Sequence, residues 1–203
     1  MVVKLIFDTE TTGLCNVKWD IDYMDFHHVV QLSWKSSNGD KGDFYIKPEG
    51  YSIPDSAIAV HGITDKMASE GGVPFRAVIK GFLDACDRAD KIIGHNTYYD
   101  TSTIKANVLR TAKLHPEEVS RSIVEKAVAV LDKDKRIDLM RKTISFCDLP
   151  FPSGKKGKKW PSLVELYRKL FNEEFPAHNA WEDVLATERC YYELLRLGVI
   201  EDD

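Results

Sequence analysis

The sequence predicts an α/β protein with a mixed central sheet, in which three antiparallel strands are joined by parallel strands and helices flank the sheet. Two observations lead to this class. Two apolar segments, 29–34 and 43–48, flank a turn with Asn38 and Gly39, which is a strong signal for an antiparallel hairpin. Later in the chain, short apolar segments alternate with longer ones of helical periodicity, the pattern of parallel strands joined by crossover helices.

The first predicted strand lies near the amino terminus. Residues 2–7 form a largely apolar run, typical of a strand that is buried on both faces. Residues 91–96 predict a short parallel strand, and residues 136–140 predict either a weak strand or the start of a helix. Because the two hairpin strands come directly after the first strand, we expect these three to form the antiparallel part of the sheet.

The predicted helices have apolar residues at helical spacing, and several are marked by a residue that favours a helix end. Gly62 ends a short helix, and Ser162 caps the helix that follows the loop 150–161. Asn179 and Glu182 form a pair similar to a capping box at the start of the last helix. The longer predicted helices are 74–89, 100–114, 116–131, 162–171 and 180–197.

Length and composition favour a single domain over residues 1–203. A chain of 203 residues that is 43% hydrophobic can bury one core. It has no apolar run of the ~20 residues that a membrane span needs and no secretory signal. Its 4 cysteines form no C-x-x-C pair, so we expect a cytoplasmic protein without structural zinc or disulfides. A net charge of −4 is unusual for a nucleic-acid binder, unless several acids surround metal ions.

Two carboxylates follow the first apolar run directly. Asp8 and Glu10 are two residues apart, so they share one face of the strand, with Cα atoms about 6.5–7 Å from each other. Like charges this close repel unless a cation lies between them or one carboxylate is protonated. The carboxyl ends of strands are also where α/β sheets form their ligand crevices. The pair is therefore a candidate metal site, although D-x-E alone is a weak motif.

Three further candidates occur later in the chain. Asp100 falls at the start of a predicted helix, where a carboxylate is favoured by the helix dipole alone. His178 lies in the loop before the last helix, and Asp183 lies in the first turn of that helix. Taken singly, Asp100 is better explained as a helix cap and His178 as an ordinary loop histidine. Together with the first pair they give the ordered set D-x-E, then D, then H-x-x-x-x-D.

In this ordered set the chain resembles the DEDDh exonucleases, the family of the proofreading subunit of bacterial DNA polymerase III, RNase T and oligoribonuclease. The likeness spans nearly the whole chain. The segments that carry it are FDTETTGL (7–14), VHGIT (60–64), HNTYYD (95–100) and AHNAWEDVLAT (177–187). His178 indicates the branch with a histidine, because Asn179 stands where the other branch has a tyrosine.

The resemblance implies a ribonuclease-H-like fold and two divalent cations held by four carboxylates, those of Asp8, Glu10, Asp100 and Asp183. Hard carboxylate oxygens without cysteine or clustered histidine partners suit Mg²⁺ or Mn²⁺. Two such ions can clamp the attacking and leaving oxygens of a displacement at phosphorus. In the family pattern His178 is the general base, for which an imidazole is suited at neutral pH.

The resemblance also implies contacts with the last nucleotide of a substrate. Thr9, Thr11 and Leu14 match positions that contact this nucleotide in the family. Val60 and His61 are expected near the same base. For Leu14 and Val60, a role in the hydrophobic core is an equal alternative.

Other segments suggest further contacts. Asn96 would either hydrogen-bond near the site or stabilise its own turn. Lys158 and Trp160 belong to a loop with four lysines, which would bind phosphates and stack on a base or would simply be solvated. Residues 15–28 form a long acidic connector that would act as a lid, a partner surface or a plain insertion.

The sequence thus predicts a metal-dependent 3′→5′ exonuclease that releases nucleoside 5′-monophosphates from a nucleic acid with a free, single-stranded 3′ end. DNA is the favoured substrate, which would suit proofreading in DNA replication, and a polymerase partner is left open. One alternative is an RNA-trimming exoribonuclease, because the same metal site can cleave the phosphodiester bonds of DNA and of RNA. The other is a nucleic-acid-binding module without activity, which the presence of all five motif residues argues against.

Overall fold

The computed structural model describes residues 2–13, 23–131 and 135–201. Within them, five strands form one sheet in the order β3-β2-β1-β4-β5. The strands are β1 (Lys4–Thr11), β2 (Val29–Ser36), β3 (Lys41–Tyr45), β4 (Lys91–Gly94) and β5 (Arg136–Asp138). β2 pairs antiparallel with both β1 and β3, whereas β1, β4 and β5 run parallel. The predicted α/β class and mixed sheet are therefore confirmed.

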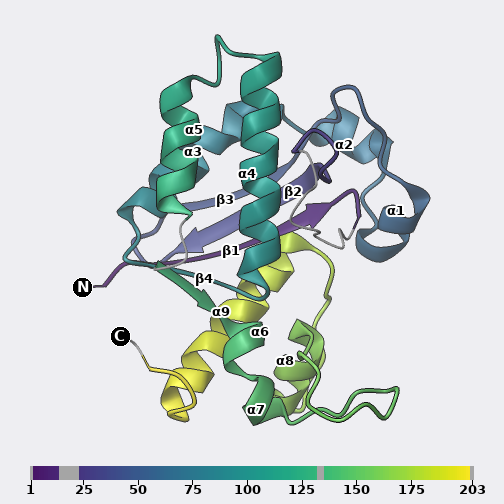
Figure 1. Cartoon of the computed structure of the whole chain (residues 1–203), viewed down its shortest axis with the longest axis vertical. Helices are drawn as coiled ribbons and strands as arrows, with labels where there is room; N and C mark the ends of the chain where they lie inside the picture. Colours follow the sequence, from purple (N-terminus) through teal and green to yellow (C-terminus); the bar gives the residue numbers. More distant parts are fainter. Residues whose placement is uncertain (1, 14–22, 132–134, 202–203) are drawn as a thin grey trace.

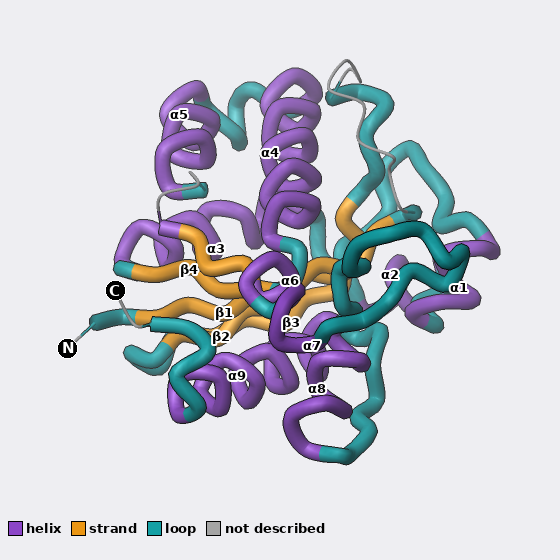
Figure 2. Tube along the Cα trace, turned by 60° about the horizontal axis from the view of Figure 1, so that its bottom comes forward, coloured by secondary structure: helices purple, strands orange, loops and turns teal. Residues whose placement is uncertain are grey.

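Helices cover both faces of the sheet. In Figures 1 and 2, α3, α4 and α5 lie on one face and α8 and α9 lie on the other, while α1 and α2 lie beyond the end of β1. The short helices α6 and α7 connect β5 with α8. The helices are α1 (Asp55–His61), α2 (Asp65–Gly71), α3 (Phe75–Arg88), α4 (Thr97–Leu114), α5 (Arg121–Val130), α6 (Leu139–Lys142), α7 (Ile144–Cys147), α8 (Leu163–Phe171) and α9 (Ala180–Arg196).

The two faces of β1 contribute to two different hydrophobic cores. Leu5 and Phe7 pack into the core under α3, α4 and α5. Ile6 packs into the core formed with α8 and α9. Because successive side chains of a strand alternate between faces, Asp8 and Glu10 continue on the α9 face and Thr9 continues on the α4 face. The alternation in this one strand decides which helix each polar side chain meets.

Local helix signals in the sequence agree with the structure. Gly62 follows α1 with φ of 73°, a left-handed conformation that glycine adopts readily. Ser162 and Glu165 form a full capping box at the start of α8. The side chain of Asn179 accepts hydrogen bonds from the first turn of α9. No helix in the ranges that the structure describes is both long and apolar enough to cross a membrane.

Several predicted boundaries are wrong. The helix expected over 116–131 begins only at Arg121, because Ser120 has extended backbone angles and the preceding residues form a turn on the carbonyl of His115. The helix expected over 100–114 begins three residues earlier, at Thr97, after Asn96 with φ of 72°. β1 also extends to Thr11, four residues beyond the predicted end, since pairing with β2 continues there.

Candidate active site

A pocket of about 400 Å³ lies beside β1, past the end of β4. β4 pairs with β1 only as far as Ile6, so from Asp8 onward no strand of the described residues pairs with β1 on that side. The chain leaves β4 at Gly94, where an added Cβ would lie 2.9 Å from the side chain of Thr97 and 3.2 Å from the carbonyl of Phe7. This close approach lets the chain turn sharply into α4. The space beside β1 that forms the pocket therefore results from the short length of β4.

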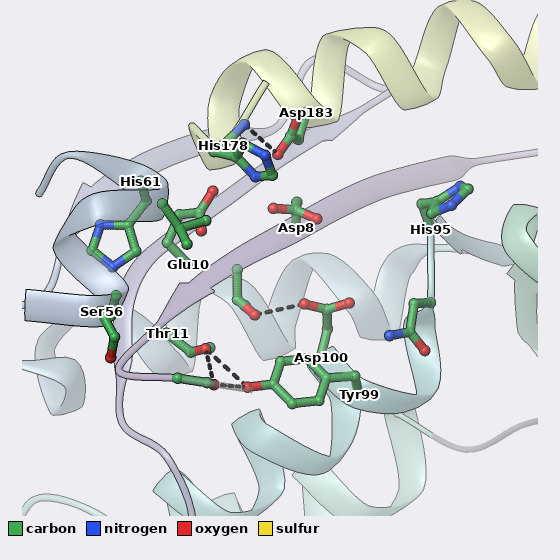
Figure 3. Close-up of a pocket in the computed structure, with 15 residues that line it drawn as sticks. Asp8, Glu10, Thr11, Ser56, His61, His95, Tyr99, Asp100, His178 and Asp183 are labelled. Atoms are coloured by element: carbon green, nitrogen blue, oxygen red, sulfur yellow. Dashed lines mark hydrogen bonds between the residues drawn. The ribbon is translucent and has the colours of Figure 1, made fainter. Parts of the chain in front are cut away.

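Carboxylates from three remote segments meet in this pocket. Asp8 and Glu10 come from β1, Asp183 from the first turn of α9 and Asp100 from the first turn of α4. Oxygen atoms of Asp8, Glu10 and Asp183 all lie within 4.8 Å of one another. In Figure 3, Asp8 lies between Asp183 and Asp100, which approach from opposite sides. The structure thus brings the four predicted acidic residues around one cavity.

Asp100 is held in place by the strand it faces. The hydroxyl of Thr9 donates a hydrogen bond of 2.6 Å to Asp100 Oδ1. Thr9 can reach this carboxylate because it projects on the α4 face of β1, opposite to Asp8 and Glu10. The single residue between the two acids of the D-x-E motif, Thr9, therefore orients the third acid.

His178 lies at the rim of the pocket, beside Asp183 (Figure 3). Its backbone N–H donates to Asp183 Oδ2 at 3.2 Å, and its φ of 69° places the backbone in the left-handed region. This turn lets Asn179 cap α9 while the imidazole stays at the pocket and remains exposed. The loop histidine and the helical aspartate are thus neighbours although they are five residues apart.

The pocket raises the pKa of all four carboxyl groups. Burial is the main cause in each case, and it raises the pKa of Glu10 to about 8 and those of Asp100 and Asp183 to about 7. The pKa of Asp8 is raised well above its usual range by burial and by the charges of Asp100, Asp183 and Glu10. Without a counter-charge, the four groups cannot all be ionised at neutral pH.

These features fit a site for hard divalent cations. Asp183 Oδ1 is buried and has no hydrogen-bond partner in the described part of the chain, so a lone pair is left for a ligand. Carboxylate oxygens without thiolates are ligands that Mg²⁺ and Mn²⁺ prefer. A bound cation would also offset the repulsion that raises the carboxyl pKa values. The acidic cluster could therefore hold metal.

Helix α1 closes one side of the pocket. His61 and Val60 line it from this helix, together with Ser56 and Ala57. His61 Nδ1 accepts a hydrogen bond from the Ile63 N–H at 3.0 Å, and burial lowers the pKa of its imidazole. His61 is therefore a neutral side chain at pH 7 that is fixed in orientation.

The other predicted contact residues have different positions. Thr9, Thr11 and Asn96 line the pocket, and Leu14 lies outside the described residues. Lys158 and Trp160 do not line it: Lys158 forms an ion pair with Asp148 at 2.9 Å, and Trp160 is exposed on a neighbouring loop.

Sequence reasoning missed several residues of the wall, among them His95 and Tyr99. Both line the pocket. The Tyr99 hydroxyl lies 2.9 Å from the Thr11 hydroxyl and also donates to the Gly13 carbonyl, which ties α4 to the end of β1. The one feature of the sequence that could have indicated them is that both lie in the same short segment, 95–100, as Asp100.

The chain is similar to known exonucleases in sequence pattern and in fold. The RNase T family model, described as an exonuclease, matches residues 5–191. Exonuclease I of E. coli in complex with a dA16 oligonucleotide superimposes with a TM-score of 0.66 at 19% identity, over 97% of this chain and 41% of that one. A zinc-bound E. coli exonuclease I complex with single-stranded DNA gives a TM-score of 0.67 at 19% identity, over 97% of this chain and 41% of that one.

A third structure, exonuclease I from Methylocaldum szegediense, gives a TM-score of 0.65 at 17% identity, over 97% of this chain and 41% of that one. This chain thus spans about two-fifths of the length of these proteins, since 41% of the E. coli chain is covered. The shared fold is the ribonuclease-H-like arrangement of a mixed sheet and flanking helices. A search of curated protein sequences finds no significant match.

Proposed function

This chain belongs to the RNase T family of exonucleases, and from that premise we propose that it is a metal-dependent 3′→5′ exonuclease acting on single-stranded ends. The observation that carries the proposal is the meeting of Asp8, Glu10, Asp100 and Asp183 around one pocket with His178 at its rim. The family match over 5–191 supports one exonuclease domain that occupies most of the chain.

We propose that the four carboxylates hold two divalent cations of the Mg²⁺ or Mn²⁺ type. When bound, such ions supply a nucleophile at neutral pH and stabilise the charge on the leaving 3′ oxygen. His178 accepts the proton of the attacking water, because its imidazole is exposed at the rim beside Asp183. The backbone hydrogen bond between these two residues keeps the base next to the carboxylate cluster. The product is a nucleoside 5′-monophosphate.

The terminal nucleotide would occupy the side of the pocket that α1 closes. Val60 offers an exposed apolar surface to a base, and Thr11 and His61 offer polar groups at the same side. DNA is favoured as substrate because the similar exonuclease I structures contain deoxyoligonucleotides. RNA is the alternative, and a contact to the 2′-hydroxyl would distinguish the two. A role beside a polymerase is left to experiment.

The first experiment replaces single carboxylates. Asp8→Asn and Asp183→Asn should each slow Mg²⁺-dependent shortening of a 5′-labelled single strand by at least about a hundredfold, because each removes a charged metal ligand. The matched control is Glu182→Gln, in the same turn of α9 but not in the pocket wall, which should keep wild-type activity. Unchanged cleavage by either Asp variant would refute the metal site. Parallel digestion of DNA and RNA oligomers determines which of the two the enzyme prefers.

The second experiment tests the general base. His178→Ala should lower kcat by about 10²–10⁴-fold and leave Mn²⁺ affinity, measured by calorimetry, within about twofold of wild type. Glu182→Gln, in the first turn of α9 but outside the pocket wall, is again the control. Loss of Mn²⁺ binding with a normal rate at saturating Mn²⁺ would instead make His178 a ligand.

A further inference from the structure

An arginine lies between two aromatic rings close to the pocket. The guanidinium carbon of Arg141 is 5.5 Å from the ring centre of Trp160 and 6.0 Å from that of Tyr98. Trp160 has 55% of its surface exposed, a large share for a tryptophan, although Arg141 lies over its ring. We call Tyr98, Arg141 and Trp160 the Trp160 platform. Its exposed indole is available for contact with another molecule.

The Trp160 platform is tied directly to the pocket wall. Pro161, the residue after Trp160, accepts a hydrogen bond of 2.9 Å from His95 Nε2, and His95 lines the pocket. Tyr98 precedes Tyr99, which also lines it. The loop that carries Trp160 is thus anchored at the edge of the site.

The platform adjoins the side of the pocket that α1 leaves open. In Figure 3, His61 on α1 and His95 lie on opposite sides of Asp8. If the 3′-terminal nucleotide lies against α1, a strand that leaves on the opposite side of Asp8 passes His95. The Trp160 platform adjoins His95 through Pro161.

Basic side chains lie in the platform and in the loop that carries it. Arg141 contacts Asp138 only at 3.7 Å, and its side chain is 55% exposed, so much of its charge faces solvent. In the same loop as Trp160, Lys155 lies over the ring of Phe151 at 5.7 Å. Among the residues that the structure describes, neither Lys155 nor Lys156 forms an ion pair. Cations beside an aromatic face suit a single strand, which offers phosphates and bases together.

We infer that the Trp160 platform binds the single-stranded segment upstream of the bond that is cleaved, with a base stacked on the Trp160 indole and phosphates near Arg141. This inference rests on the proposed function, because it assigns a path to the substrate of the same pocket. It makes Trp160 and Arg141 substrate-binding residues, outside the group that performs the chemistry.

The experiment compares a long and a short substrate in the full-length chain. Trp160→Ala should weaken the binding of a fluorescein-labelled 12-nucleotide single strand, measured by anisotropy in EDTA, by about tenfold or more. Trp160→Phe keeps an aromatic face and should retain most of the affinity. Hydrolysis of thymidine 5′-monophosphate p-nitrophenyl ester, which has no upstream base, should stay unchanged in both variants.

The matched control is Tyr192→Ala. Tyr192 is 44% exposed and has the Lys4 ammonium 5.6 Å from its ring centre, yet it does not line the pocket. This variant should bind the strand like the wild type. Equal strand affinity of Trp160→Ala and wild type would overturn the platform and leave the nuclease intact. Strand binding that depends on Trp160, in a chain that hydrolyses neither substrate, would support the platform and refute the proposed activity.

Discussion

The carboxyl groups of the pocket oppose the stability of the fold whenever no cation is bound. Burial raises the pKa of Glu10 to about 8 and those of Asp100 and Asp183 to about 7. A raised pKa means that the folded chain holds a proton over a pH range in which the unfolded chain has already lost it. Each group therefore lowers the stability of the fold as the pH rises from its pKa in the unfolded chain to its pKa in the folded chain. The residues that would bind metal are those that destabilise the metal-free protein.

The free energy of unfolding in EDTA should therefore depend on pH with a definite sign. Between about pH 4, where unfolded carboxyls ionise, and about pH 8, where Glu10 does so in the fold, the folded state binds more protons than the unfolded state. Stability should fall as pH rises through this window, by about 1.4 kcal/mol for each unit by which the pKa of one group is shifted. Urea unfolding at stepped pH measures it.

Asp8→Asn and added Mg²⁺ provide the two controls for this pH dependence. Asparagine in place of Asp8 removes a carboxylate whose ionisation is unfavourable in the pocket, so the decline of stability with pH should become shallower. Mg²⁺ in place of EDTA should flatten the decline in the wild type, because a ligand that binds only the folded state stabilises it. A stability that is constant or rises between pH 5 and 8 in EDTA would contradict the carboxylate assignment.

At the scale of single elements, α4 fixes the segment that leads back into β2. Arg110 on this helix donates hydrogen bonds to the carbonyls of Tyr23 at 2.8 Å, Met24 at 3.1 Å and Phe26. Asn107, one turn earlier, donates to the carbonyl of His27 at 2.8 Å. No sequence pattern indicates this role, because the partners are backbone atoms 80 or more residues away.

Arg110→Met should lower the free energy of unfolding by about 2–3 kcal/mol, since the carbonyls of Tyr23, Met24 and Phe26 lose a charged donor. Arg110→Lys should restore less than half of the lost stability, because one ammonium group cannot replace a planar guanidinium that donates hydrogen bonds to several carbonyls. Urea unfolding of the three proteins decides this. Wild-type stability of Arg110→Lys would show that charge alone is enough.

The start of α9 is positioned by the sheet. Gln31 is buried in β2, and its Oε1 accepts a hydrogen bond of 3.1 Å from the Ala180 N–H. Its Nε2 donates to Asp43 Oδ1 on β3 at 2.8 Å, and this carboxylate also accepts a hydrogen bond from Ser33. Asp183 lies in the same first turn of α9, so the network sets the distance between that carboxylate and β1.

Gln31→Met, which keeps the side-chain volume but removes both hydrogen bonds, should weaken Mn²⁺ binding by about tenfold and lower the free energy of unfolding by about 1–2 kcal/mol. Calorimetry with Mn²⁺ and urea unfolding measure the two effects. A loss of stability with unchanged Mn²⁺ affinity would mean that the network supports the fold without positioning Asp183.

Elements with local signals were predicted well, and those that depend on distant contacts were not. The Asn38 and Gly39 turn and the Ser162 cap are encoded in adjacent residues, and both are found in the structure. The start of α4 was misplaced because Asn96 adopts a left-handed conformation that Asp138 stabilises from β5, through a hydrogen bond of 3.0 Å to the Asn96 N–H. Such a contact between remote segments leaves no periodic pattern in the sequence.

At the scale of the whole molecule, the sequence could predict the order of the strands only in part. The antiparallel strands follow from the hairpin, and the parallel ones follow from the crossover helices. The convergence of Asp8, Asp100 and Asp183 was expected from the family resemblance, since no local pattern shows that β4 stops early enough to leave the gap beside β1. His95 and Tyr99 complete this gap from the turn after β4. Packing of the whole sheet therefore decides the shape of the pocket.

The charge of the whole molecule predicts how it meets a nucleic acid. The net charge is −4, and four buried or half-buried carboxylates surround the pocket that a phosphate must enter. Arg141 lies against Trp160, whose neighbour Pro161 is hydrogen-bonded to His95 of the pocket wall, so without a cation the strand would be attracted to one surface and repelled by the next. Cation binding and strand binding should therefore be coupled, each favouring the other.

Ca²⁺, a hard cation that carboxylates bind, should raise the affinity of the metal-free chain for a labelled single strand by about tenfold or more. The double variant Asp8→Asn with Asp183→Asn should bind the strand without Ca²⁺ more tightly than the wild type does in EDTA, because two repelling charges are gone. Anisotropy titrations at fixed ionic strength measure both effects, since exposed charges are screened by salt. An affinity that is the same with Ca²⁺ and with EDTA would mean that the strand avoids the carboxylates and binds through the basic surface alone.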